Sequence, residues 1–138
     1  MDHNTNRQDL GLLLARVMLG VVFAFHGAQK LFGWFGGGGF DATVQAFTGM
    51  EMPMPTVSAA LAGGAEFFGG VALIAGFASR LASIPLTFTM LVAALAVHGS
   101  AFGLQNGGME YALTLAINAA AVGLLGPGRI AAGKGRLA

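Results

Sequence analysis

Four long stretches of apolar residues dominate the chain and restrict the folds open to it. They run from about residue 10 to 32, 57 to 77, 81 to 102 and 109 to 125. A helix needs about 17–25 predominantly apolar residues to cross a bilayer, so three stretches fit comfortably and the fourth is at the short end. The runs are continuously apolar rather than alternating, which excludes the strands of a membrane β-barrel. We therefore predict four membrane-spanning helices.

The composition agrees with a lipid environment. Of 138 residues, 55% are hydrophobic and only 9% are charged, whereas a soluble chain carries roughly 25% charged residues. The alternative is a soluble helical bundle, but its helices would each carry a charged face. The second stretch has one charged residue, Glu66. The prediction is an all-α, four-helix membrane bundle that forms a single domain over residues 1–138.

Residues 33–56 form the one long loop between predicted spans. Within it, Phe40, Val44 and Phe47 recur at helical spacing, behind Asp41 as a plausible N-cap and ahead of Gly49. This pattern predicts a short amphipathic helix that lies on the bilayer surface.

The basic residues near the span ends predict the orientation of the chain. The opposite loops carry Asp41 and Glu51 but no Lys or Arg, and Lys and Arg concentrate on the cytoplasmic side. Both termini are therefore expected in the cytoplasm, with the long loop outside. The first apolar stretch lacks a cleavage site and is expected to be retained as a span. The basic residues on the side of the termini are Arg7, Arg80, Arg129, Lys134 and Arg136.

Net charge and cysteine content exclude several classes of function. A net charge of +1 gives no field that would recruit nucleic acid. The chain has no Cys, which excludes disulfides, thiolate metal sites and iron–sulfur clusters within it. The remaining His and Glu show no metal-ligand spacing, so no metal site is predicted. No redox centre is encoded, and electrons for any redox role would come from a partner protein or a soluble donor.

Ionisable side chains inside the predicted spans carry the functional signal. Each costs about 2.5–3.5 kcal/mol on insertion, so these residues need partners. Each predicted helix sends at least one of them into the outer half of the bilayer, and opposite charges are available for pairing. The candidate ligand-binding residues are His26, Lys30, Glu66, His98 and Glu110.

Two interpretations of this polar layer remain open. Its members could simply pair and fix the register of the helices. They could instead line a pocket for a small ligand or a proton, with His26 and Glu66 sharing a proton with a quinone or phenol oxygen. Nearby aromatic side chains could stack on a flat ring. They are Phe32, Trp34, Phe35, Phe67 and Phe68.

Two further expectations concern Arg16 and the small residues. Arg16 lies nearer the cytoplasmic end of the first stretch and is expected to extend to the interface. Small residues four apart indicate close helix contacts. Such pairs are Gly11 with Ala15, Ala60 with Gly64, Ala72 with Gly76 and Ala119 with Gly123.

The order of several short motifs resembles the DoxX family over about residues 10–130. The tail after Gly128 departs from the common family pattern, because it reads Arg-Ile-Ala-Ala-Gly. The motifs that carry the resemblance are Arg16 to Gly20, His26–Gly27, Lys30 to Gly33, Gly63 to Glu66 with Gly69 and Gly70, Gly76, Arg80, His98, Gly107 to Tyr111 and Gly126 to Gly128.

The resemblance implies a multi-pass protein of the bacterial inner membrane with a periplasmic long loop. Some relatives are linked to quinone reduction and others to oxidative-stress complexes, so a quinone is the candidate ligand. We expect a quinone-linked redox subunit or accessory protein without independent catalytic activity. Its expected partners are a redox protein and, as a homo-oligomer, further copies of this chain. The alternatives are a membrane scaffold or assembly protein and a small transporter or binder of a lipid-soluble molecule.

Overall fold

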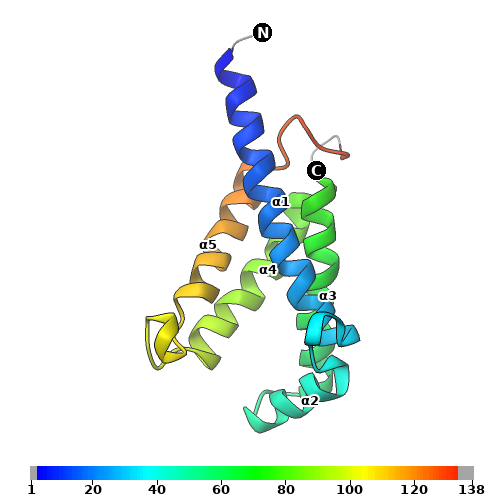
Figure 1. The fold of residues 1–138 in the computed structure, drawn as a ribbon, viewed down its shortest axis with the longest axis vertical. Helices are drawn as coiled ribbons and strands as arrows, with labels where there is room; N and C mark the ends of the chain where they lie inside the picture. The colour runs from blue at the N-terminus through cyan, green and yellow to red at the C-terminus, as the bar shows by residue number, and fades with distance from the viewer. Residues whose placement is uncertain (1–2, 134–138) are drawn as a thin grey trace.

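The protein is all-helical in the computed structural model, which describes residues 3–133. Its α-helices are α1 (His3–Phe32), α2 (Gly39–Gly49), α3 (Pro55–Ala75), α4 (Ser79–Val92) and α5 (Glu110–Leu125) (Figure 1). Short helical turns lie at Trp34–Gly36, Ala93–Val97 and Leu104–Asn106. Residues 3–133 contain no strand, which confirms the predicted all-α class.

Three helical segments are long and apolar enough to cross a membrane. They are Asn6–Phe32, Pro55–Ala75 and Ser79–Val97. The fourth, α5, is apolar but has 16 residues, or about 24 Å against a hydrocarbon core of about 30 Å. A fourth crossing therefore remains a prediction.

The segment predicted to run from residue 81 to 102 ends earlier than expected. Helix α4 continues as one π-helical turn over Ala93–Val97, and His98 lies just beyond it. The next residues are Gly99 and Ser100, which favour turns over helix. His98 is thus a helix-end residue rather than a residue inside a span.

The long loop contains α2, which begins two residues before the predicted N-cap. Gly38 takes the N-cap position, and Asp41 lies inside the first turn. A carboxylate in the first turn is still favourable, because it faces the positive end of the helix dipole. That α2 rests on the bilayer surface remains a prediction.

The helices pack as two pairs, α1 against α3 and α4 against α5. The pairs lie together near the chain ends and diverge toward α2 and the loop of residues 98–109 (Figure 1). The α1–α3 contact depends on glycine, because a Cβ on Gly20 would lie 2.6 Å from the carbonyl oxygen of Gly70. Two of the predicted small-residue pairs do not serve this purpose, since a Cβ on Gly11 or Gly64 would meet nothing within 4 Å.

One end of the bundle is tied together, and we call it the closed end. It comprises residues 9–16, the α3–α4 turn at residues 76–78 and residues 126–133. The amide of Ala132 bonds to the carbonyl oxygen of Ala75 at 3.0 Å, and the amide of Arg129 donates to Asp9 at 3.1 Å. The C-terminal segment therefore lies beside the α3–α4 turn and is bonded to α1 at Asp9. The predicted basic residues Lys134 and Arg136 lie outside the described residues.

Arg16 does not extend to the interface as expected, since its side chain is 1% exposed. Its guanidinium donates to the carbonyl oxygens of Leu73, Ile74 and Ile130. The last carbonyls of a helix lack partners within that helix, and here Arg16 supplies those partners at the end of α3. Because the chain folds back at residue 130, the cation is enclosed instead of snorkelling.

Candidate functional site

A cavity of about 770 Å³ lies between the diverging helix pairs at the end opposite the closed end. We call this the open end; it also includes α2 and residues 98–109. Most of the lining is apolar, with a few ionisable and hydroxyl groups. The lining includes Phe23, His26, Lys30, Phe47, Met50, Met52, Ser58, Leu61, Glu66, Pro85, Phe88, Thr89, Met90, Val97, His98, Tyr111 and Leu115.

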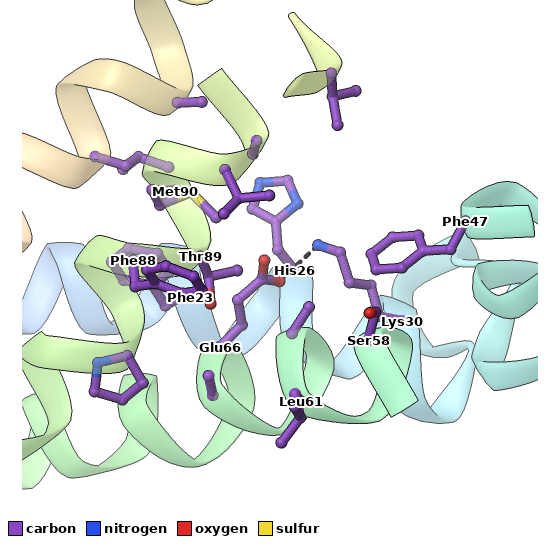
Figure 2. A pocket seen from close by; sticks show the side chains of 18 of the residues that line it. Phe23, His26, Lys30, Phe47, Ser58, Leu61, Glu66, Phe88, Thr89 and Met90 are labelled. Atoms are coloured by element: carbon purple, nitrogen blue, oxygen red, sulfur yellow. Dashed lines mark hydrogen bonds and ion pairs between the residues drawn. The ribbon is translucent and has the colours of Figure 1, made fainter. Parts of the chain in front are cut away.

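An ion pair between α1 and α3 forms one wall of the cavity. Lys30 Nζ lies 2.6 Å from Glu66 Oε2, and the two side chains point toward one another (Figure 2). Glu66 is 2% exposed at its side chain and Lys30 is 29% exposed. The cation therefore faces open space, while its carboxylate partner is enclosed by protein.

The packing of α1 on α3 places this pair. Gly63 lies one turn before Glu66, and a Cβ there would be 2.7 Å from Leu31 Cδ2. The small residue lets α1 approach α3 at the level of Lys30. Two opposite charges on facing helices then meet without a bridging residue, which meets the expectation that charges in the spans find partners.

His26 lies one turn before Lys30 on α1 and also faces the cavity (Figure 2). Its imidazole is half-buried and lies on the same side of the cavity as Lys30 and Glu66 (Figure 2). On the other side, the Tyr111 ring lies 6.2 Å from it, centroid to centroid. Cation, carboxylate and imidazole thus gather on one wall of a mostly apolar space.

His98 and Glu110 are placed differently from each other. His98 lines the cavity, and its Nδ1 lies 2.9 Å from the carbonyl oxygen of Gly107. Glu110 does not line the cavity, because its Oε1 accepts the amide of Leu104 at 2.7 Å. Four of the five predicted site residues therefore share one cavity, and Glu110 instead orders the loop before α5.

The aromatic residues expected to stack on a ligand do not line the cavity. They pack on one another beside it, with Phe32 at 4.8 Å from Trp34 and 5.0 Å from Phe67 between ring centroids. Aromatic rings gain more from edge and offset contacts with each other than from exposure. The rings that do line the cavity are those of Phe23, Phe47, Phe88 and Tyr111.

Several lining residues were not identified from the sequence. Tyr111 is next to Glu110, which was predicted to bind a ligand. A tyrosine near the start of a helix has no spacing pattern that would mark it as a cavity residue. Thr89 lies four residues after Pro85 on α4, a spacing that places both on one helix face and could have indicated a lining stripe. Met50 and Met52 come from the segment after α2. No sequence pattern in this segment predicts that it lines the cavity.

The arrangement suits an uncharged, lipid-soluble molecule with polar oxygen atoms. The apolar walls favour burial of a ring or chain, and a few polar groups fix its orientation, as in most small-molecule sites. Lys30 supplies donors, Glu66 supplies acceptors, and His26 can do either. Among residues 3–133, no three metal-ligating side chains gather into a group.

Comparison with known proteins agrees with the motif order noted in the sequence. The DoxX family matches residues 11–99, which is more than half of the chain. A Bacillus subtilis (strain 168) protein named "Putative oxidoreductase CatD" is 31% identical over 109 residues, covering 78% of this chain and 74% of that relative. No solved structure matches. The protein belongs to the DoxX family of membrane proteins.

Proposed function

We propose that this protein binds a quinone in the cavity at its open end and acts as a quinone-linked redox subunit or accessory of the bacterial inner membrane. The observation that carries the proposal is the composition of the cavity. An apolar space of about 770 Å³ has the Lys30–Glu66 pair and His26 on a single wall. Ligand sites typically span about 300–1,000 Å³, which accommodates a substituted ring and part of an apolar tail.

Access from the bilayer supports a lipid-soluble ligand. Leu61 on α3 and Phe88 on α4 line the cavity, yet they are 69% and 68% exposed. A residue can line a cavity and also be largely exposed only if it lies at the rim of an opening. The rim therefore lies between α3 and α4, on surfaces that face hydrocarbon in a membrane protein, and a quinone would enter there.

The polar wall suits both redox forms of a quinone. Carbonyl oxygens of the oxidised form accept hydrogen bonds, and hydroxyl groups of the reduced form donate them. Lys30 can donate to the former and Glu66 can accept from the latter, while His26 can hold or release a proton beside them. A bound quinone would supply the two-electron, two-proton chemistry, and a partner protein would supply or remove the electrons. The relative named as an oxidoreductase supports a redox role.

The exposed basic residues support the proposed orientation. Arg7, Arg80 and Arg129 lie at or near the closed end and are exposed. With Lys and Arg on the cytoplasmic side, the closed end faces the cytoplasm and the cavity faces the periplasmic half of the bilayer. Four crossings are part of the proposal, since both chain ends then share one side.

Quinone binding can be tested on purified protein in nanodiscs. A short-tailed quinone is titrated against the wild type, Lys30→Met, Glu66→Gln and, as the matched control, Glu110→Gln. We expect each cavity variant to lose about ten- to a hundredfold in affinity, because a hydrogen bond to a charged group contributes about 1.5–3 kcal/mol. Glu110→Gln should bind like the wild type, because Glu110 lies outside the cavity.

The redox part is tested separately in membranes. The ratio of quinol to quinone is measured in extracts of cells that produce the wild type or Glu66→Gln at equal levels. The proposal expects the two ratios to differ. Binding without a change in this ratio favours a transporter or binder of lipid-soluble molecules. No binding by well-folded wild type favours the scaffold alternative.

A further inference from the structure

Helix α5 carries an exposed stripe whose chemistry differs from the other lipid-facing surfaces. The stripe follows alternating steps of three and four residues, which place its members along one side of the helix. All of its members are exposed. We call this the α5 seam; it consists of Tyr111, Thr114, Asn118, Ala121 and Leu125.

Large apolar side chains cover the other exposed helix faces. On α1 these include Leu14 and Met18, at 64% and 62% exposed, and on α4 they include Ile84 and Phe88, at 67% and 68%. Such side chains suit contact with lipid. The α5 seam instead presents a phenol, a hydroxyl, an amide and a methyl group over its first three turns.

Asn118 is the least expected member of the seam. It lies about 12 Å along α5 from Glu110, near the middle of the helix. One amide N–H donates to the carbonyl oxygen of Thr114 at 2.8 Å, and no residue in the 3–133 range donates to its Oδ1. A polar group left unpaired in hydrocarbon costs free energy, so this exposed amide calls for a partner outside the chain.

A shallow groove of about 240 Å³ runs beside Asn118, between α1 and α5. The two helices make few contacts with each other. The α1 side of the groove is lined by Ala15, Met18, Leu19 and Val22. Side chains from another helix laid along the α5 seam could fill this groove.

We infer that the α5 seam is the interface of a symmetric dimer, with a second copy of this chain as its occupant. The asparagine amide is self-complementary, because it carries both donors and an acceptor. Copies inserted with one topology run parallel, so a two-fold axis along the membrane normal would bring the two Asn118 side chains together. A step pattern of three and four with one buried Asn is the arrangement that specifies register in parallel helix pairs.

The inference rests on the proposed fourth crossing but not on quinone binding. Of the seam residues, Tyr111 also lines the cavity, whereas Thr114, Asn118, Ala121 and Leu125 do not. The inference can be tested directly because the chain has no Cys. Single cysteines are introduced as Thr114→Cys, Asn118→Cys and Ala121→Cys in membrane vesicles. The controls are Ile117→Cys and Leu124→Cys, at residues that are 61% and 81% exposed on the neighbouring stripe of the same helix. They lie about 80° and 100° around α5 from the middle of the seam, at about 100° per residue.

We expect oxidation to give a cross-linked dimer of this chain from the three seam positions and little from the two controls. In addition, Asn118→Leu should raise the dimer dissociation constant about tenfold, since interhelical hydrogen bonds in membranes contribute about 1–2 kcal/mol. Counting subunits by photobleaching in vesicles measures that constant, with Ile117→Leu as the control. Equal cross-linking at all five positions, or monomers throughout, contradicts the inference; cross-links to a different protein would assign the seam to that protein instead.

Discussion

At the closed end the buried cation Arg16 is bonded to three backbone carbonyl oxygens, whereas at the open end the cation Lys30 is bonded to one carboxylate beside a cavity. Arg16 is 1% exposed and Lys30 is 29% exposed at its side chain. Backbone carbonyls are fixed in place by their helices. A side-chain pair can be rearranged by a ligand that offers a new partner.

The two ends of the bundle have different roles. The closed end holds α1, α3 and the C-terminal segment in one arrangement, because Arg16 on α1 bonds to the other two. The open end leaves the helix pairs apart (Figure 1). The Lys30–Glu66 pair lines the cavity between them. The stability of the bundle should therefore depend most on the closed end, and ligand binding on the open end.

The largest expected effect is at Arg16. Arg16→Leu leaves the carbonyl oxygens of Leu73, Ile74 and Ile130 without their donors, and we expect a loss of about 4 kcal/mol in unfolding free energy. Unfolding in mixed detergent micelles measures the change. Arg16→Lys keeps the charge but has fewer hydrogen-bond donors. Its unfolding free energy should lie between those of the wild type and Arg16→Leu. Wild-type stability in Arg16→Leu would contradict a structural role for the closed end.

The next effect is at the open end. Glu66→Gln leaves Lys30 without its carboxylate, and we expect a loss of about 2 kcal/mol, less than for Arg16 because Lys30 is partly exposed. The double variant Lys30→Met with Glu66→Gln should recover part of the loss, since no unpaired cation remains. A double-mutant cycle in the same micelles measures the coupling. Zero coupling would contradict the Lys30–Glu66 pair in the folded protein.

A smaller effect tests the α1–α3 contact that joins the two ends. A Cβ on Gly27 would collide with the backbone of Phe67, so Gly27→Ala must push the helices apart. We expect a loss of about 1.5 kcal/mol from overpacking. The matched control is Gly11→Ala on the same helix, where a Cβ meets nothing within 4 Å. Equal unfolding midpoints for the two variants would overturn the packing described for α1 and α3.

The smallest effect is a gain in stability at the α3–α4 turn. Ala78 precedes α4 with a φ of 47°, a left-handed conformation that is strained for a residue with a Cβ. Ala78→Gly should relieve that strain and raise the unfolding free energy by about 0.5 kcal/mol, after the greater freedom of glycine in the unfolded chain is counted. Ala78→Val, which adds strain, should lower it.

The sequence predicted the helices better than their contacts. Long apolar runs must become helices in a bilayer, so the approximate positions of α1, α3 and α4 followed from where those runs lie in the sequence. Glycine spacing identifies a helix face but not the neighbour of that face. Gly11 and Gly64 have the expected spacing yet face open space, whereas Gly20 and Gly27 lie against α3.

The candidate site shows the same limit. The sequence placed Lys30, Glu66 and Glu110 in the outer half of the bilayer and left either carboxylate open as a partner of Lys30; Glu66 fills that role. Glu110 is equally acidic, but the nearby amide of Leu104 occupies its carboxylate. Arg16 found backbone partners at Ile130 because the chain folds back there, a long-range event with no local pattern in the sequence.

The most direct test of the account is to map where a quinone lies in the protein. A photoreactive quinone analogue is cross-linked to the protein in nanodiscs, and the labelled residues are identified by peptide mass spectrometry. We predict labels on cavity residues of three helices, such as Phe23, Leu61 and Met90, and their loss when unlabelled quinone is in excess. Labels on lipid-facing residues such as Phe77 and Ile84, unaffected by competing quinone, would contradict a quinone site in the cavity.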